Sequence, residues 1–231
     1  MHLNVRAAAG ILGVSEKTVY RWLRQGHLPG HAVGDQLRFN RTELLEWATA
    51  RGIAVTSGIL DDAAAPAGGV TLSEALAAGG VYEDVAGADK NEVLQAIVER
   101  VTLPPGLERD ELLRVLLARE SMGSTGVGNG IAIPHVRHPI VLHVAKAFVA
   151  LCYLRAPIPF QALDGKPVHT VFVIVSSSVK GHLDLLSRLA LALKHAGFAE
   201  AVRRRASAEE ILRECRRAET EALAAAPLTK E

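Results

Sequence analysis

The sequence has few cysteines, no long apolar run and almost no net charge. Its two cysteines, Cys152 and Cys215, are too few for a disulfide framework and too far apart for the CxxC pair of a metal knuckle. Each lies in an apolar pattern, so we expect both to be small core residues. The formal net charge of +1 gives no reason to expect a membrane or nucleic-acid partner from the chain as a whole.

No segment is apolar for long enough to cross a bilayer. The most apolar stretch, residues 140–154, contains His143 and Lys146 and is too short for a membrane-spanning helix. The first residues lack the apolar core of a signal peptide. We therefore expect a cytoplasmic protein without membrane contacts. Hydrophobic residues still make up 49% of the chain, which argues against wholesale disorder and supplies a packed core.

The chain divides at residues 53–70, where small residues, a proline and several glycines replace any sustained hydrophobic period. This composition predicts a flexible linker between a first domain over 1–52 and a second over 71–220, with a tail over 221–231. Residues 1–52 contain seven basic and four acidic residues, which is a local excess of three positive charges.

The first domain has the pattern of a small helical unit with a hairpin. Ser15 is a good N-cap, and Asn40 can open a further helix with Glu43 three residues later. The predicted elements are helices over 5–12 and 15–25, a turn at 13–14, a hairpin over 27–39 and a third helix from residue 40.

The second domain alternates helical and strand-like patterns. Thr71 and Ser207 each begin a capping box, and residues 145–154 and 168–175 are almost continuously apolar, which indicates a sheet covered on both faces. The predicted elements are helices from 71, from 89, over 108–120, over 183–196 and from 207, with strands over 131–133, 145–154 and 168–175. The predicted fold class is α/β (α+β), with a mixed β-sheet flanked by helices.

A glycine-rich loop separates the helix over 108–120 from the strand over 131–133, with glycines at 123, 126, 128 and 130. Glycine tolerates positive φ and lets an anion approach backbone N–H groups closely. No Gly-Lys-Ser/Thr follows, as it would in a Walker A loop, and a helix rather than a strand precedes the loop, unlike in a dinucleotide-binding motif. The loop alone therefore leaves open both a phosphate cradle and an ordinary mobile loop.

The residues around this loop carry a longer signature. Residues 119–135, RESMGSTGVGNGIAIPH, resemble the motif of type-2 enzyme IIA domains of the bacterial sugar phosphotransferase system, closest to the nitrogen-regulatory branch. The resemblance extends over roughly residues 71–218 and includes 157–160, 164–168 and His182-Leu183. It implies that His135 accepts a phosphoryl group from a phosphohistidine carrier of the HPr type. The chemistry agrees, because a neutral imidazole is a good nucleophile near neutral pH.

By the same resemblance, Arg119 and His182 complete the catalytic site with His135. Arg119 would pair with phosphoryl oxygens, and His182 would lie near a helix start, where N–H groups favour an anion. No metal and no cofactor are needed when donor and acceptor are both histidines. The residues expected to cradle the phosphoryl group through the loop are Gly123, Ser124, Thr125, Gly126, Gly128 and Asn129.

Other interpretations of these residues are open at this point. His135 could be a structural strand-end histidine, Arg119 a helix-end cation and His182 a solvent-facing cap. His135 and His138 form an H-x-x-H pair near His143, but neither the spacing nor the carboxylates match a known zinc ligand set.

One residue departs from the family pattern. The residue after the histidine is usually small in this family, whereas here it is the β-branched Val136. A β-branched residue stiffens the backbone, so we expect Val136 to affect access to His135 and the rate of transfer.

Residues 3–29, LNVRAAAGILGVSEKTVYRWLRQGHLP, resemble the excisionase/MerR-like winged helix-turn-helix, and the resemblance extends to about residue 50. It implies that the second helix enters a groove of double-stranded DNA and that the hairpin with Arg38 forms a wing. Lys and Arg can reach phosphates or guanine edges. The alternative is a protein-binding helical domain with a solvated basic face. The candidate DNA-binding residues are Lys17, Thr18, Arg21, Arg24 and Arg38.

Together these observations predict a phosphotransfer protein, more than a turnover enzyme, that couples phosphorylation of His135 to DNA binding and regulation of transcription. Its expected partners are an HPr-type phosphocarrier, double-stranded DNA and a second copy of the chain, since a homodimer would place two recognition helices about one DNA turn apart. The alternative is a phosphoryl carrier in a sugar-uptake chain, with the first domain as a protein-docking module. A phosphoryl group would add about −1.5 to −2 charges at one site, which is the physical basis of a switch.

Overall fold

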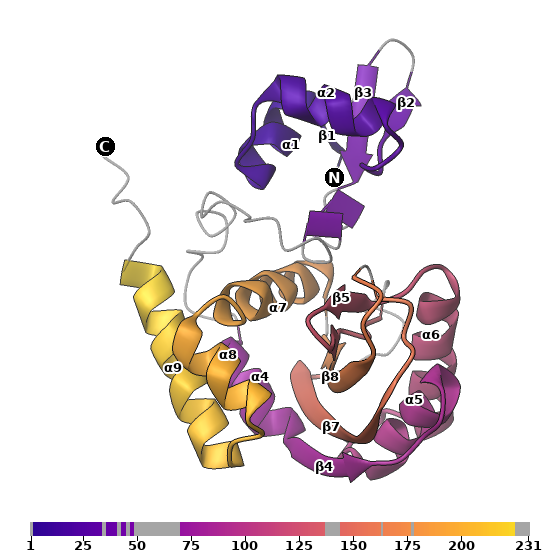
Figure 1. Cartoon of the computed structure of the whole chain (residues 1–231), viewed down its shortest axis with the longest axis vertical. Helices are drawn as coiled ribbons and strands as arrows, with labels where there is room; N and C mark the ends of the chain where they lie inside the picture. The colour runs from indigo at the N-terminus through magenta and orange to yellow at the C-terminus, as the bar shows by residue number, and fades with distance from the viewer. Residues whose placement is uncertain are drawn as a thin grey trace. The chain divides into compact units, whose positions relative to one another are not determined.

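The computed structural model describes residues 2–33, 36–40, 43–44, 47–48, 70–136, 144–162, 164–176 and 178–224. The chain divides into two compact units, Met1–Gly68 and Gly69–Glu231, whose elements are labelled in Figure 1. Within the described ranges, no helix is both long and apolar enough to cross a membrane.

The described part of the first unit combines the helices α1 and α2 with a small antiparallel sheet of order β1-β3-β2. Asn4 and Ser15 cap the helices by accepting the N–H groups of Ala7 and Thr18, and Gly13 ends the first helix in the left-handed region at φ 61°. Residues 43–44 and 47–48 are helical, within the range predicted for a third helix. The elements are β1 His2–Leu3, α1 Val5–Leu12, α2 Glu16–Arg24, β2 His31–Val33 and β3 Gln36–Asn40.

Apolar residues from both helices and β3 form the core of the first unit. Val19, Leu12 and Phe39 are buried there. The rings of Trp22 and Trp47 lie with their centroids 5.3 Å apart, and both contact this core. Since burial uses one face of α2, the opposite face of the helix is left to solvent.

The second unit is a five-stranded mixed sheet of order β4-β7-β8-β6-β5, flanked by helices. The β4–β7 and β6–β8 pairs are parallel, and the β7–β8 and β5–β6 pairs are antiparallel. The predicted fold class is therefore confirmed. The elements are α4 Leu72–Gly79, β4 Val81–Val85, α5 Lys90–Arg100, α6 Arg109–Ser121, β5 Gly126–Gly128, β6 Ile131–Ala132, β7 Phe148–Ile158, β8 Val168–Val175, α7 Val179–Ala192, α8 Ala196–Arg203 and α9 Ala208–Ala224.

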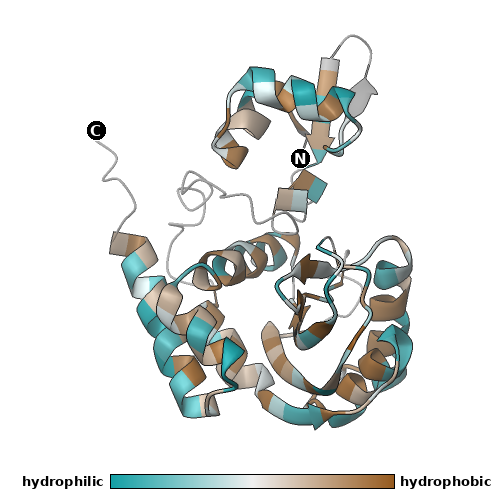
Figure 2. Ribbon diagram, viewed as in Figure 1, coloured by the Kyte–Doolittle hydropathy of each residue, from teal (hydrophilic) through white to brown (hydrophobic). Residues whose placement is uncertain are grey.

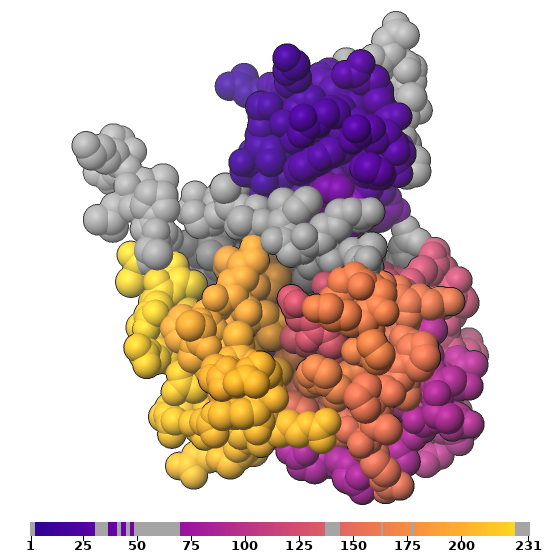
Figure 3. Space-filling model, viewed as in Figure 1, coloured from indigo at the N-terminus to yellow at the C-terminus, as the bar shows by residue number. Residues whose placement is uncertain are grey.

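Helices cover both faces of this sheet, which explains why its central strands are apolar throughout. In β8, Val171 and Val173 face the cluster that includes residues of α5 and α6, whereas Phe172 and Ile174 face the cluster formed with α4 and α7–α9. Figure 2 shows the corresponding hydrophobic colour along β7 and β8. In the space-filling view, the surfaces of α7 and α9 lie side by side at one edge of the unit (Figure 3).

Several elements differ from the sequence prediction. Helix α7 begins at Val179 rather than 183, because Ser178 caps it by accepting the N–H of Gly181 at 3.0 Å. Strand β7 begins at Phe148 rather than 145 and runs on to Ile158. Among the described elements, those that the pattern did not predict are β1, β4, β5 and α8.

Candidate active site

His135 lies at an edge of the sheet where two parallel strands end. It follows β6, and α7 follows β8; since β6 and β8 are adjacent and parallel, their carboxyl ends meet at one edge. Ligand sites of open α/β sheets form at such edges. The backbone is fixed there, because the N–H of Ile174 donates to the carbonyl of Pro134 at 3.0 Å. The His135 side chain is 3% exposed.

Two hydrogen bonds define the protonation state of the His135 ring. Nδ1 lies 2.8 Å from the carbonyl oxygen of Ile133, which can only accept, so Nδ1 carries the proton. Arg119 Nε–H, which can only donate, lies 3.2 Å from Nε2. The network therefore assigns the neutral tautomer in which Nε2 holds an unshared electron pair.

The remaining contacts join residues from three separate elements. The rings of His135 and His182 have centroids 4.9 Å apart and an interplanar angle of 35°. His182 is buried in the first turns of α7, four residues after its Ser178 cap. Arg119, in the last turn of α6, also donates from Nη1 to the carbonyl of Gly123 at 2.9 Å. The structure thus brings together the three residues expected to be catalytic.

The glycine-rich loop is partly a strand, since Gly126–Gly128 pairs with β6. Three of its N–H groups donate to side-chain acceptors: that of Thr125 to Glu120, that of Gly126 to Ser124 Oγ and that of Asn129 to Asp164. Before these amides could cradle a phosphoryl group as predicted, they would have to leave their present acceptors.

Position 128 favours glycine for two reasons. Its φ of 92° is one that residues with a side chain rarely adopt, and an added Cβ would lie 3.3 Å from the Asp164 carboxylate. Asn129 also has a positive φ, 52°, which asparagine tolerates better than most residues. The N–H of Gly123 donates to the carbonyl of Glu120, and Ser124 Oγ–H donates to the carbonyl of Phe160.

An ion pair beside the loop, between a half-buried lysine and a buried carboxylate, was not predicted from the sequence. Glu120 is 6% exposed and pairs with Lys90 at 3.0 Å. No short motif connects the two residues, which are thirty positions apart and meet only because α5 packs against α6.

Val136 does not line the approach to the histidine ring. Its side chain is buried in the core cluster that contains Phe148 and Val144. The expected effect on access therefore has no direct steric basis at Val136 itself. His138 and His143 lie outside the described residues. In the described part of the chain, no group of three His, Cys, Asp or Glu side chains could hold a metal ion.

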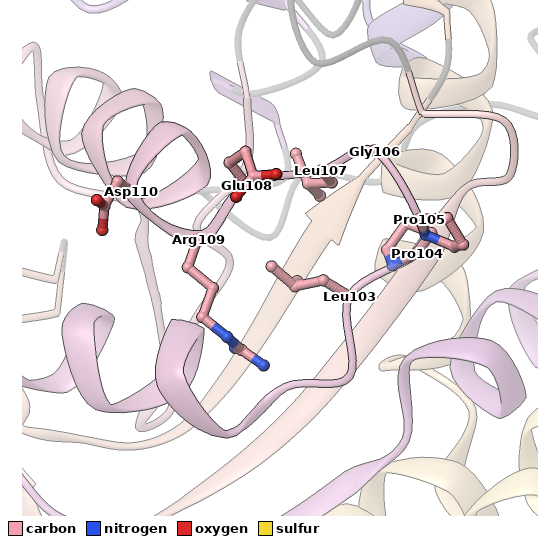
Figure 4. Close-up of a pocket in the computed structure, with 8 residues that line it drawn as sticks. All are labelled: Leu103, Pro104, Pro105, Gly106, Leu107, Glu108, Arg109 and Asp110. Atoms are coloured by element: carbon pink, nitrogen blue, oxygen red, sulfur yellow. The ribbon is translucent and has the colours of Figure 1, made fainter.

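A cavity of about 370 Å³ lies in the connection between α5 and α6, and no expected site residue lines it. Arg109 points along its wall in Figure 4 and donates to the carbonyl of Val101 at 3.1 Å. This hydrogen bond satisfies the carbonyl of the residue that caps α5, so Arg109 has a structural role in the connection. The lining residues are Leu103, Pro104, Pro105, Gly106, Leu107, Glu108, Arg109 and Asp110.

In the first unit, Lys17, Arg21 and Arg24 are exposed on α2. Their spacing of four and three residues places them on one face of the helix, opposite the buried Val19. Thr18 is half-buried, with its hydroxyl 3.0 Å from Ser15 Oγ, so it supports the cap. Arg38, on β3, is half-buried.

Comparisons with known proteins agree with both units. The family model described as "Phosphoenolpyruvate-dependent sugar phosphotransferase system, EIIA 2" matches residues 76–217, and a helix-turn-helix domain model matches residues 3–52. The chain is 35% identical over 145 residues to a nitrogen regulatory protein of Pseudomonas aeruginosa, covering 62% of this chain and 92% of that protein.

Two further similarities concern the second unit. A fructose-specific EIIA component of Haloferax volcanii is 40% identical over 90 residues, which is 38% of this chain and 56% of that protein. The crystal structure of the nitrogen regulatory protein IIA-Ntr from Neisseria meningitidis superposes with a TM-score of 0.50 at 34% identity, covering 58% of this chain and 91% of that one. The chain therefore belongs to the EIIA type-2 family of the phosphoenolpyruvate-dependent sugar phosphotransferase system and carries a helix-turn-helix domain before it.

Proposed function

We propose that this chain is a regulator that accepts a phosphoryl group on Nε2 of His135 from an HPr-type phosphohistidine carrier, and that this changes DNA binding by its first unit. The observation that carries the proposal is the hydrogen-bond geometry of the His135 ring, which assigns its tautomer. Its Nδ1–H is held by the carbonyl of Ile133, and its Nε2 electron pair faces the guanidinium of Arg119. A neutral imidazole held in one tautomer is a prepared nucleophile.

In the proposed transfer, the Nε2 electron pair attacks the phosphorus atom carried by the donor histidine. The new N–P bond forms as the donor's N–P bond breaks, and the electron pair of that bond returns to the donor imidazole. The proton on Nδ1 stays on the acceptor ring, bonded to Ile133. Because the transition state is loose, the protein contributes mainly by positioning groups and stabilising charge.

In the proposed phosphorylated state, the phosphoryl oxygens replace Nε2 as the hydrogen-bond acceptor of Arg119. Its Nε–H now donates to Nε2, and that electron pair is used once the N–P bond forms. The phosphoryl oxygens bonded through Nε2 are then the nearest anionic acceptors, and guanidinium–phosphate hydrogen bonds are charge-assisted. His182, whose ring lies tilted beside the acceptor ring, would orient the same phosphoryl group.

The regulatory half of the proposal rests on the first unit. Nitrogen regulatory proteins are among the similar proteins, and a helix-turn-helix domain adds an exposed basic helix face. Phosphorylation can change DNA affinity only if the two states of His135 differ in their affinity for DNA, for a partner or for a second copy of the chain.

A carrier role in sugar uptake is the second candidate, favoured by the similarity to a fructose-specific EIIA component. In that role the phosphoryl group would pass on to a sugar-specific acceptor protein, and the first unit would dock a protein. DNA affinity that is the same with and without the phosphoryl group would favour this candidate.

The test of the phosphoryl half uses the full chain and an HPr-type carrier phosphorylated beforehand. We expect one phosphohistidine in the wild type, mapped by mass spectrometry to His135, and none in His135→Ala. His27→Ala is the matched control, since His27 is an exposed histidine of the first unit and should leave the phosphohistidine unchanged. An undiminished phosphohistidine in His135→Ala would overturn the assignment.

A further inference from the structure

The buried carboxylate of Glu120 has more partners than a packing role needs. Its Oε2 accepts hydrogen bonds from the N–H and from the hydroxyl of Thr125, at 3.0 and 2.7 Å. Its Oε1 accepts from Lys90 Nζ at 3.0 Å. A buried carboxylate is stable only when it is paired and hydrogen-bonded in this way, so its position is tightly determined.

One path of hydrogen bonds leads from Glu120 to Nδ1 of His135. Glu120 fixes Thr125, and the carbonyl of Thr125 accepts the N–H of Ile133 at 2.9 Å. The carbonyl of Ile133 then holds the Nδ1 proton at 2.8 Å. The acceptor that selects the tautomer is therefore placed by the strand segment that Glu120 anchors.

A second path leads from Glu120 to Nε2. Arg119 precedes Glu120 in the last turn of α6, and its guanidinium is aligned by the carbonyl of Gly123. The N–H of Gly123 in turn donates to the carbonyl of Glu120 at 3.2 Å. The donor to Nε2 thus depends on the segment over residues 120–125, which begins at the main-chain carbonyl of Glu120 and is held closed by the Glu120 carboxylate through Thr125.

Lys90 neutralises the negative charge of the Glu120 carboxylate. It is the first residue of α5, donates to Gln161 at 3.0 Å as well as to Glu120, and lies 5.5 Å from the centroid of the Phe160 ring. An unneutralised carboxylate in this place would oppose the arrival of a phosphoryl group, because like charges repel strongly where water is excluded. The pair therefore anchors the loop without adding net charge to the site.

We propose that Glu120, neutralised by Lys90, is a positioning residue that holds His135 in its Nδ1–H tautomer and aligns Arg119 with Nε2. This inference rests on the proposed function for its effect on phosphoryl transfer, whereas its effect on the tautomer is independent of that function.

The test compares Glu120→Gln with Glu219→Gln in the full chain. Both carboxylate oxygens of Glu120 accept hydrogen bonds, one from Lys90 and the other from Thr125. Gln has only one acceptor oxygen, so in Glu120→Gln an NH₂ group must face one of these donors. Glu219 is a matched control, because its half-buried carboxylate also accepts two backbone N–H groups, from Leu72 and Ser73, and pairs with Arg188. We measure melting temperature, the ¹⁵N signals of the His135 ring and the single-turnover rate of phosphorylation by the phosphorylated carrier.

Both variants should melt at a lower temperature than the wild type, but only Glu120→Gln should change the ¹⁵N signals of the His135 ring. We expect its two ring nitrogens to shift toward a mixture of tautomers, with transfer at least about tenfold slower, while Glu219→Gln keeps the wild-type signals and stays within about twofold of the wild-type rate. The double variant Lys90→Met/Glu120→Gln should regain part of the wild-type signature, because the Gln oxygen can then turn to Thr125.

Wild-type ring signals together with a rate like that of Glu219→Gln would overturn the positioning role and leave the proposed function standing. If the wild type accepts no phosphoryl group at all, the proposed function fails. The ring signals of Glu120→Gln then still decide the inference, since changed signals support it and unchanged signals refute it.

Discussion

At the scale of single residues, the site depends on the hydrogen bond from Arg119 Nε–H to His135 Nε2. We predict that Arg119→Ala slows phosphorylation of His135 by about 10²-fold, as expected when a charge-stabilising group is lost, without removing the acceptor nitrogen. Arg119→Lys should restore little, because an ammonium group cannot bond Nε2 and the Gly123 carbonyl in the same plane. Single-turnover transfer with mass mapping measures this, and Arg114→Ala, an exposed arginine earlier in α6, is the control. A change of less than about twofold in Arg119→Ala would rule out its role.

The two cysteines are expected to be chemically inert. Both are fully buried, and burial raises the pKa of the Cys152 thiol and of the Cys215 thiol to about 12. Since the thiolate is the nucleophile, almost none is present at pH 8. We predict no alkylation of the native chain by iodoacetamide at pH 8 and complete alkylation in denaturant, measured by mass spectrometry. Labelling of either cysteine at the rate of a free thiol would contradict the packing around it.

At the scale of elements, capping residues and apolar periods predicted most of the helices and the central strands. Ser15, Thr71 and Asp89 cap their helices as expected. The missed elements lack such signals. Strand β4 has polar residues at its centre, β5 is made of Gly-Val-Gly, and α8 follows α7 almost at once with a histidine, His195, as its cap. Pairing with neighbouring strands, rather than local preference, defines the missed strands β1, β4 and β5, whereas α8 forms where the chain packs against α9.

Two helical glycines should respond to alanine with opposite signs. A Cβ at Gly79 would lie 2.3 Å from the backbone oxygen of Val149, where α4 packs on β7, whereas nothing lies within 4 Å of a Cβ at Gly10 in α1. We predict that Gly79→Ala destabilises the second unit by about 1–3 kcal/mol through overpacking. Gly10→Ala should stabilise the first unit by about 0.5–1 kcal/mol, because alanine loses less backbone entropy than glycine.

Denaturant titration of the full chain can separate the two effects. Trp22 and Trp47, the two tryptophans of the sequence, both lie in the first unit, so tryptophan fluorescence follows that unit. Far-ultraviolet circular dichroism is dominated by the longer second unit. A stabilised second unit in Gly79→Ala, or a destabilised first unit in Gly10→Ala, would show that the contacts around these glycines differ from those described.

At the scale of the whole molecule, the sequence predicted the three residues of the candidate site, but it did not predict the ion pair and the hydrogen bonds that position them. His135, Arg119 and His182 stood in recognisable motifs, and the structure brings them together. The Lys90–Glu120 pair could not be predicted, because it depends on how α5 packs against α6 rather than on any spacing along the chain. That the loop amides cradle a phosphoryl group stays a prediction, and a local motif does not show that the folded chain brings side-chain acceptors to three of them.

The last prediction joins the two units. We expect the full chain to bind double-stranded DNA weakly and with strong salt dependence, since one small module neutralises few phosphates. Lys17→Ala and Arg21→Ala, on the exposed face of α2, should each weaken binding and reduce the salt slope by about one, whereas Arg114→Ala removes the same charge from the second unit and should change little. Phosphorylation of His135 should alter the affinity or the fraction of dimer, because a switch requires different affinities in its two states. Gel-shift and sedimentation measurements at several salt concentrations, with and without the phosphorylated carrier, test both halves. The DNA-binding half fails if no retardation occurs at low salt, and the coupling half fails if affinity and dimer fraction are the same in both states.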